Sequence, residues 1–448
     1  FRRKGFTFDA ASHFYPLLGN PSSITGKLLH ELGVTTRWVK MDPVDHFCFP
    51  DGSRFSVPAD YDTYLAKLKA EFPHEAVALD RFFKAVHDTY KLGLLYFFRW
   101  RDTPRLDPYR DLTVGEVLDD YFDDPKLKLL LVADGPHWGS PPNRTSFVFD
   151  SMLRLSYFLG NYYPVGGSQV FADELAQRFE ERGGHILMHS NVKKILTESG
   201  SVCGVEVETG PKQKRFVKQV KAGVVVSNAD LLQTVEKMLD PEQVDSEYLD
   251  HIRQLRPTHP CFLTHIGLKD ISTETLRKIQ GYYWNEWDPN LLAQNGLRFK
   301  IFIPTLFEPK LAPPGCHVMI IQKVLDMHHY DVTDWASHKA SVEGYILEHL
   351  EKIVPGIKDK MVVKLSASAL TSYRFTLNHQ GAMLGWEMSP DQLGEQRVSI
   401  VGPVKNLFFT GHWTQPGGGI TPVIVSAMQV AQAVTQGVSS TRSQASVS

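Results

Sequence analysis

The segment between Asn406 and Pro422 contains the residues of this chain best suited to hold a small anionic ligand. Gly411 and residues 417–419, which are all glycine, lack a Cβ, so the backbone there can turn sharply or approach a ligand closely. Thr421 stands where a helix N-cap is expected, with Pro422 at the first helical position. A helix start carries partial positive charge and free N–H groups, so this junction could hold an anionic cofactor. An ordinary strand, loop and helix explains the same pattern, and both interpretations stay open on the pattern alone.

Motifs for other kinds of chemistry are missing or incomplete. The run from Gly19 to Lys27 has too many residues between its glycines for a nucleotide P-loop, and Leu28 stands where a Ser or Thr should hold magnesium. No H-E-x-x-H or G-x-S-x-G motif occurs, and the adjacent His328 and His329 would point in different directions. We therefore predict no metal site and no catalytic triad. The G-x-G-x-x-G loop that usually cradles a dinucleotide is also absent from the sequence.

Length and composition predict an ordinary globular protein of two to three domains, since the chain has 448 residues, 42% of them hydrophobic. The formal net charge of -2 gives no global attraction to nucleic acid, so we predict no nucleic-acid partner. Four widely spaced cysteines predict reduced, partly buried thiols in a reducing compartment. No apolar run approaches the roughly 20 residues of a membrane span, although peripheral contact with a membrane stays possible.

Hydrophobic periodicity predicts an α/β protein whose elements position the glycine segment. Residues 407–410 and 224–226 read as short buried strands, and Ser168 is expected to cap a helix that ends near Arg182. The basic run 212–221 is read as the solvated edge of a hairpin rather than as a phosphate-binding patch. The remaining predicted elements are a hairpin over 47–57 turning at Asp51-Gly52, helices over 61–131 with a capping box at Thr113 and Glu116, strands over 186–195, 202–207, 262–268, 299–303 and 318–323, and a helix over 335–353.

The stretch from Tyr90 to Arg101 is dense in aromatic and aliphatic residues and is flanked by cations. Such a segment could lie in a membrane interface, with its aromatic side chains inserted and Lys91, Arg99 and Arg101 near the head groups. A buried lid helix explains the same composition. We favour the buried helix and keep membrane contact as the alternative.

Three motifs together identify a family resemblance. With Asn406 to Val434, Tyr163-Pro-Val-Gly-Gly-Ser-Gln169 and Val224-Val-Val-Ser-Asn-Ala-Asp230, the chain resembles the phytoene desaturase, carotenoid isomerase and retinol saturase family of FAD-dependent oxidoreductases. The order of motifs matches over nearly the whole chain. The family's dinucleotide fingerprint is the one missing element, and from the resemblance we expect it to lie upstream of Phe1, in a chain truncated at its N-terminus.

The resemblance implies a set of cofactor-binding and cavity residues. Arg2 or Arg3 would lie near the pyrophosphate, the Val192 backbone would read the adenine edge, and Asn228 with Ala229 would close over the adenosine. Gly411 would lie by the pyrophosphate or ribitol. The isoalloxazine would meet residues of the helix start, namely Gly418, Gly419, Thr421 and Pro422. The G-x-x-x-G motif from Gly381 to Gly385 places cavity candidates nearby, namely Met383, Trp386, His412 and Trp413, for which plain packing is the alternative. The family's D-x-G is Asp9-Ala10-Ala11 here, which puts the geometry beneath the flavin in doubt.

The fold implied is a Rossmann-like FAD-binding domain, discontinuous and without its fingerprint, plus an α+β substrate domain with a helical lid. The FAD-binding domain would comprise residues 1–32, 160–239 and 396–436, the substrate domain residues 33–159 and 240–395, and residues 439–448 a disordered tail. The function implied is desaturation, saturation or cis–trans isomerisation of a carotenoid or other polyprenoid lipid, with the flavin supplying the chemistry. An amine-oxidase-like flavoenzyme and a non-catalytic lipid-binding or assembly protein are the alternatives. The resemblance also implies a cytoplasmic or plastid location, with peripheral attachment to a membrane as an open alternative. The oligomeric state stays open.

Overall fold

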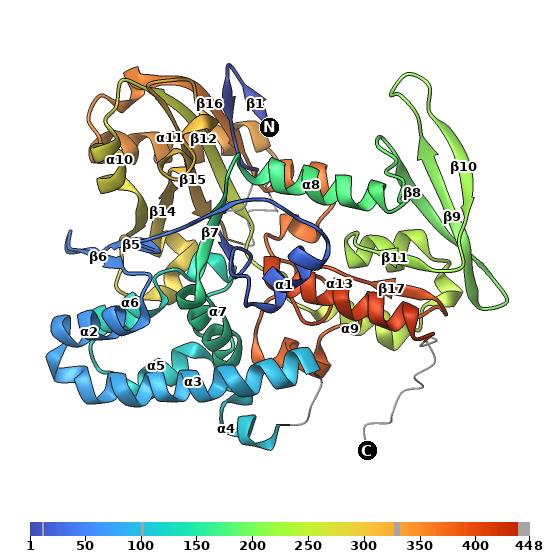
Figure 1. Cartoon of the computed structure of the whole chain (residues 1–448), viewed down its shortest axis with the longest axis horizontal. Helices are drawn as coiled ribbons and strands as arrows, with labels where there is room; N and C mark the ends of the chain where they lie inside the picture. The colour runs from blue at the N-terminus through green and yellow to red at the C-terminus, as the bar shows by residue number, and fades with distance from the viewer. Residues whose placement is uncertain (11–12, 100–102, 327–331, 438–448) are drawn as a thin grey trace.

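The computed structural model describes residues 1–10, 13–99, 103–326 and 332–437. It has the mixed α/β class predicted from the sequence, with a large sheet, a group of helices beneath it and a smaller region of strands and helices beside both (Figure 1). Four predictions concern residues outside these ranges, namely Ala11 in the region expected beneath the flavin, Arg101 of the aromatic stretch, the pair His328 and His329, and the tail 439–448. The division into two discontinuous domains stays a prediction.

A seven-stranded mixed sheet forms the upper left of Figure 1 and contains the strands predicted near residues 262–323. Its side chains alternate between two cores. In β15, Val318 and Ile320 face the core shared with the lower helices, while Met319 and Ile321 face the core covered by α10 and α11. In order across the sheet the strands are β16 (Met361–Ala367), β12 (Cys261–Lys269), β15 (Cys316–Val324), β14 (Leu297–Phe302), β13 (Gly281–Trp284), β5 (Asp45–Cys48) and β6 (Arg54–Val57). The covering helices are α10 (Thr273–Ile279) and α11 (Trp335–Ile353), the second with the predicted bounds.

The helical region predicted over residues 61–131 lies below this sheet in Figure 1. The capping box is confirmed, because the Thr113 side chain accepts from the Glu116 backbone while the Glu116 carboxylate accepts from the Thr113 N–H. The predicted hairpin is also confirmed as β5 and β6. The helices of the region are α2 (Tyr61–Glu71), α3 (Ala76–Arg99), α4 (Asp107–Arg110), α5 (Val114–Tyr121), α6 (Pro125–Val132) and α7 (Phe147–Leu159).

The region on the right of Figure 1 contains the two short strands predicted around the glycine segment. Strand β11 (Val225–Ser227) pairs in parallel with β17 (Leu407–Phe409), so their carboxyl ends meet at one edge. The prediction of a buried strand is confirmed for β17 and is wrong for β11, because Val226 is 46% exposed. Helices α1 (Ile24–Glu31), α8 (Ser168–Glu181) and α13 (Ile420–Thr435) belong to the same region. The N-cap of α8 is Gly167, so the prediction that Ser168 caps this helix is wrong by one residue. A three-stranded sheet joins it to the rest of the molecule, in the order β3 (Tyr15–Pro16), β7 (Asn161–Pro164) and β4 (Trp38–Lys40).

A second three-stranded sheet, β10 (Phe216–Lys221), β9 (Ser201–Thr209) and β8 (Asn191–Glu198), lies at the far right of Figure 1. The basic run is confirmed as an edge strand, because β10 pairs with β9 alone among the described strands and is mostly exposed. The prediction that a strand begins at residue 186 is wrong by five residues. His189 adopts a positive φ of 53°, a conformation that interrupts extended backbone, and β8 begins only after it.

Candidate functional site

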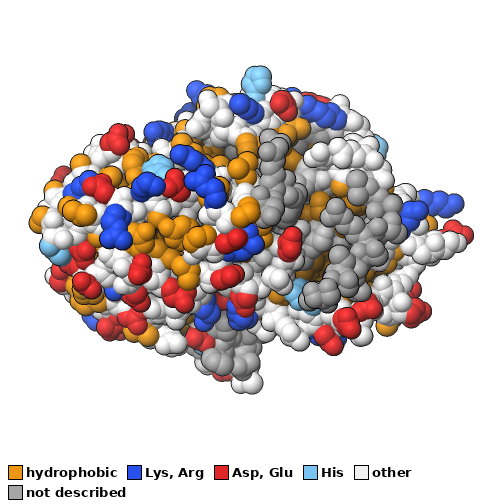
Figure 2. All heavy atoms as spheres, turned by 90° about the horizontal axis from the view of Figure 1, so that it is seen from below, with side chains coloured by type: hydrophobic (Ala, Val, Ile, Leu, Met, Phe, Trp, Pro, Cys, Tyr) orange, Lys and Arg blue, Asp and Glu red, His pale blue; other side chains and the backbone are white. Residues whose placement is uncertain are grey.

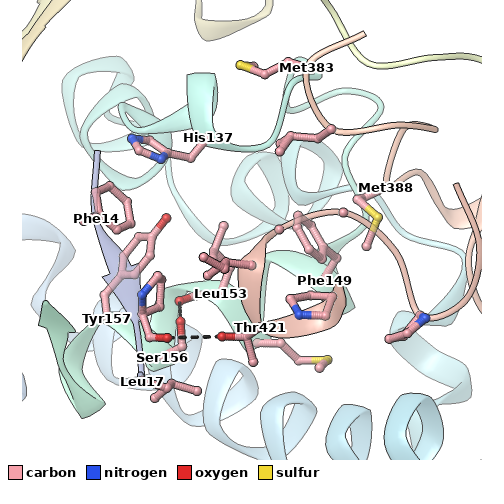
Figure 3. A pocket seen from close by; sticks show the side chains of 18 of the residues that line it. Phe14, Leu17, His137, Phe149, Leu153, Ser156, Tyr157, Met383, Met388 and Thr421 are labelled. Carbon is pink, nitrogen blue, oxygen red and sulfur yellow. Dashed lines mark hydrogen bonds between the residues drawn. The ribbon is translucent and has the colours of Figure 1, made fainter. Parts of the chain in front are cut away.

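The start of α13 forms the centre of the predicted site, with one correction to the sequence analysis. The helix begins at Ile420 and its N-cap residue is Gly419, with φ +101°, so Thr421 is not the N-cap and Pro422 is not the first helical residue. The Thr421 hydroxyl instead donates to the Pro16 carbonyl at 3.1 Å, drawn as a dashed line in Figure 3. Pro422 is tolerated because a residue in the first turn needs no N–H for an intrahelical bond. The helix start therefore still presents N–H groups and partial positive charge.

Asn228 and Gly411, predicted from separate motifs, lie together at the carboxyl ends of β11 and β17. A Cβ at Gly411 would lie 2.2 Å from the Oδ1 atom of Asn228. The Gly411 N–H donates to the Ser426 hydroxyl of α13 at 2.9 Å. Gly411 therefore provides space beside Asn228, while its N–H is already used within the protein. Sequence reasoning missed Ser426, although it is one of few polar residues in an apolar helix.

A cavity of about 310 Å³ opens against the start of α13. Of the predicted site residues, the structure places five in its wall, namely Met383, Gly418, Gly419, Thr421 and Pro422. Apolar side chains from α3, α7 and the segment before β17 form most of the remainder, including Tyr90, Leu94, Phe97, Phe149, Leu153, Met388 and Leu393. Figure 3 shows Thr421 and Leu17 on one side of this pocket and His137 on another. The volume lies at the lower end of the range typical of small-molecule sites.

The other three cavity candidates do not line this cavity. Trp386 and Trp413 are 1% and 3% exposed and pack edge to face in the core beneath β17, with ring centroids 4.6 Å apart. The packing interpretation of both tryptophans is therefore the one that the structure favours. His412 adjoins them, and burial, with a contribution from the Arg397 charge, lowers its pKa to about 4.

Arg397 is a buried residue that sequence reasoning missed. Its guanidinium is 2% exposed and donates to the carbonyls of Trp386 at 3.2 Å and His412 at 2.7 Å. Further bonds reach the carbonyls of Thr414 and Glu387. One cation thus joins the segment that carries Met383 to the segment that leads into α13. A lone arginine in a polar, irregular stretch gives no sequence signal for such a role.

The remaining predicted cofactor residues lie apart from the cavity wall. Arg2 and Arg3 form the exposed strand β1 (Arg2–Arg3), whose hairpin partner β2 (Phe6–Thr7) places Phe6 against Gly267 of the large sheet. Val192 lies in β8, and the Ala229 N–H donates to the Ser227 hydroxyl at 3.3 Å. Their roles toward a cofactor stay predictions.

The aromatic stretch from Tyr90 onward lies in α3 and turns one face to the cavity. Tyr90, Leu94 and Phe97, spaced at helical intervals, line it, and Phe97 is 5% exposed. Lys91 and Leu95 on the other face are exposed. Figure 2, which views the molecule from the side of α3, shows exposed hydrophobic side chains bordered by both signs of charge. Within the described residues, no helix is long and apolar enough to cross a membrane. Residues 100–102, including Arg101, lie outside the described ranges.

A polar cluster at another wall of the cavity also went unrecognised in the sequence. His13 and His137 line the cavity with their rings 6.4 Å apart. Lys300, which is 1% exposed, lies behind His137 and is paired with Asp45 at 3.0 Å. Burial, and then the Lys300 charge, lowers the pKa of both histidines, so both are neutral at neutral pH. The members come from four distant segments, and none forms a motif with its neighbours in sequence.

Comparison with known proteins gives a consistent result. The model of a family described as "Flavin containing amine oxidoreductase" matches residues 1–435. Prolycopene isomerase 1 from an Oncidium hybrid cultivar, named as chloroplastic, is 25% identical over 97% of this chain and 76% of its own length. The neurosporene-forming phytoene desaturase of Cereibacter sphaeroides is 25% identical over 88% of this chain and 79% of its own length.

Solved structures share the fold. An oxidoreductase from Methanosarcina mazei superposes with a TM-score of 0.65 at 16% identity, covering 96% of this chain and 90% of its own. A putrescine oxidase bound to putrescine superposes with a TM-score of 0.59 at 12% identity, covering 97% of this chain and 90% of its own. At these identities the likeness concerns the fold alone.

Proposed function

Because this chain belongs to the family of flavin-containing amine oxidoreductases, we propose that it uses FAD to act on carbon–carbon bonds of a carotenoid or other polyprenoid lipid. Membership makes it a flavin-containing oxidoreductase; the choice of FAD and of a polyene substrate is the proposal. The reaction is a desaturation, a saturation or a cis–trans isomerisation. Relatives that bear the names of carotenoid isomerases and desaturases support this substrate class.

The apolar cavity at the start of α13 carries the proposal. Its wall combines hydrophobic side chains of α3 and α7 with backbone of the glycine segment, so an apolar chain can lie against a cofactor-sized surface. Leu94, Phe97 and Leu153 offer dispersion contacts and no charge. Such walls suit a polyene and give a polyamine no ion pair.

The residues at the start of α13 fit a flavin. A Cβ added at Gly419 would reach only the Pro422 ring, at 3.5 Å, so this stretch of backbone is open on the cavity side. The partial positive charge of the helix start would stabilise the negative charge of a reduced flavin ring. We infer that Gly418, Gly419 and Thr421 hold the ring, and that Asn228 and Gly411 lie along the remainder of the cofactor. When bound, the flavin supplies the redox chemistry of the reaction.

The protein's own part in the reaction is to bind, orient and exclude water. The helix α3 closes the cavity along one side through Tyr90, Leu94 and Phe97, and Phe149 and Met388 lie on a further side (Figure 3). Thr421 is fixed by its bond to Pro16, which holds the helix start against the strand β3. No acid or base of this chain is required to break a carbon–hydrogen bond in this scheme, in agreement with the absence of a recognisable triad.

The amine-oxidase alternative receives less support from the side chains. An aromatic cage beside the flavin would favour it, but the tryptophans of the two segments nearest α13, Trp386 and Trp413, pack in the core. Family membership likewise favours an enzyme over a non-catalytic lipid-binding protein.

Visible spectroscopy tests the proposal directly. The protein, expressed with any residues that precede Phe1 in its gene, should purify with flavin absorbance. Under anaerobic conditions, or after reduction for an isomerase, a carotenoid should be converted while putrescine leaves the spectrum and the substrate unchanged. A preparation that cannot bind flavin contradicts the proposal, and conversion of putrescine instead of any carotenoid would establish the amine-oxidase alternative.

A further inference from the structure

The cavity wall formed by His13, His137 and Tyr157 differs from the apolar walls around it. His13 is 5% exposed, and its Nε2 atom has no hydrogen-bond partner among the described residues. The Phe14 ring lies 4.3 Å from that of His137 and 5.5 Å from that of Tyr157, so the three polar residues surround an aromatic floor. A buried polar atom without a partner is costly, which indicates that a ligand satisfies it.

The cation behind this wall has no donor left for a ligand. The Lys300 ammonium contacts Asp45 Oδ2 at 3.0 Å, His137 Nε2 at 3.0 Å and the Tyr282 hydroxyl at 2.8 Å. An ammonium has three N–H donors, and these three contacts use them all. A ligand carboxylate would therefore meet two neutral imidazoles and no available cation. A ligand ammonium would meet the Lys300 charge, and the Asp45 carboxylate is already paired with that cation.

A neutral oxygen fits the same wall. A hydroxyl can donate to or accept from an imidazole nitrogen, and a carbonyl can accept from it when that nitrogen carries the proton. The Tyr157 hydroxyl, which lies near Asp134 but makes no hydrogen bond of normal geometry, offers a second contact. In Figure 3, His137, Phe14 and Tyr157 lie on one side of the pocket and Thr421 lies away from His137, so the polar wall and the start of α13 are separate parts of the lining.

We propose that the wall of His13, His137 and Tyr157 binds a hydroxyl or carbonyl group at the end of the polyene, while its hydrocarbon part lies along the apolar walls. The inference rests on the proposed function and narrows its substrate class from carotenoids and other polyprenoid lipids to oxygenated ones. Because the cavity is small, a long carotenoid would place one end here and leave its remainder outside the cavity.

Binding of two carotenoids with the same skeleton tests the proposal. Zeaxanthin differs from β-carotene by a hydroxyl on each ring, and quenching of the protein's eight tryptophans reports binding of either. We expect the wild-type protein to bind zeaxanthin about 5- to 20-fold more tightly than β-carotene, the effect of one satisfied buried hydrogen bond. His13→Leu should remove this preference by lowering the affinity for zeaxanthin while leaving the affinity for β-carotene unchanged. Tyr157→Phe should reduce the preference.

The controls separate this inference from the proposed function. Tyr248→Phe removes another buried, unpartnered hydroxyl, on α9 (Ser246–Gln254) outside the cavity, and should leave the preference intact. Equal affinity of the wild-type protein for the two carotenoids overturns the inference, and this measurement needs no variant to fold. A preference for crocetin, which ends in carboxylates, also overturns it. Retained flavin absorbance with no hydroxyl preference leaves the proposed function standing, whereas failure to bind flavin removes that function itself.

Discussion

The side-chain oxygen of Asn228 lies over the backbone of Gly411, where a Cβ would approach it to 2.2 Å. The two residues follow the parallel strands β11 and β17 and lie far apart in the sequence. The Gly411 N–H is bound to Ser426 of α13, so three segments meet at this one glycine. Its value to the fold lies in the absent side chain and in its φ of +97°.

Replacing Gly411 should therefore disturb the site for two reasons, backbone strain and a clash with Asn228, whose effects can be measured separately. Gly411→Ala introduces a positive-φ alanine, which costs about 1–2 kcal/mol, and a clash with Asn228 that adds to it. Asn228→Ala should relieve the clash but not the backbone strain, so the double variant should lose less stability than the sum of the singles. Urea unfolding measures the stabilities, and flavin absorbance measures occupancy.

A matched control measures the stability lost through backbone strain alone. Gly315 has a φ of +73° and nothing within 4 Å of an added Cβ, so Gly315→Ala should show strain without a clash. If Gly411→Ala and Gly315→Ala lose the same stability, the close approach of Asn228 has no energetic effect.

Arg397 should be among the most sensitive buried residues. Arg397→Met leaves the carbonyls of Trp386 and His412 without their donor, and we expect a loss of about 3–5 kcal/mol in the free energy of unfolding. Near-ultraviolet circular dichroism should change too. Arg397 joins the segments that carry Trp386 and Trp413, and the rings of these two residues pack against each other. Arg253→Met, whose side chain is 54% exposed and paired with Glu236, should cost less than about 1 kcal/mol. Similar losses in the two variants would contradict a structural role for Arg397.

Glu174 of α8 should contribute stability that depends on pH. Burial acts to raise its pKa, but hydrogen bonds from Thr36 and Thr35 outweigh burial and lower the pKa to about 2. The folded protein therefore binds this proton less tightly than the unfolded chain. The stabilisation is complete above the ordinary pKa of 4.5 and is lost as the pH falls from there to about 2.

Glu174→Gln should lower the free energy of unfolding on the order of 1–2 kcal/mol at pH 7, and by less near pH 3. Urea unfolding across this pH range measures the difference. Glu180→Gln, on the exposed side of the same helix, should have little effect at any pH. A difference between wild type and Glu174→Gln that does not change with pH would count against the linkage.

Membrane contact through α3 depends on its outer face, because Phe97 is buried. If the helix touches lipid, Lys91→Glu with Leu95→Ser should reduce flotation with anionic liposomes several-fold, through loss of one cation and one exposed apolar side chain. Val77→Ser changes the 76% exposed side chain near the other end of α3 and should leave flotation unchanged. If the double variant floats as well as the wild-type protein does, or if the wild-type protein does not float at all, this face of α3 is not a membrane anchor.

Local signals in the sequence predicted much of the framework. The positions of β11 and β17, the hairpin at Asp51-Gly52, the Thr113 capping box and the bounds of α11 all follow from periodicity and turn chemistry within a few residues. The predicted N-cap of α13 is wrong. Gly419 occupies that position, and the Thr421 hydroxyl bonds to a residue outside the helix.

The polar parts of the site could not be predicted, for a different reason. His13, His137 and Lys300 come together only through tertiary packing, and each alone is an ordinary buried residue. Arg397 bonds to backbone carbonyls, which leave no trace in the identity of the residues that offer them. Likewise, the two tryptophans had the right composition for a cavity wall, and only the packing around them assigns them to the core.

The hydrogen bond from Thr421 to Pro16 joins residues 405 positions apart, and this separation sets when the pocket can exist. A ribosome adding about 5–20 residues per second needs roughly 20–80 s to pass from the first partner to the second. During that interval the apolar walls from α3 and α7 have no helix start to close against. These walls therefore stay open during synthesis, and the pocket can close only after the start of α13 has left the ribosome.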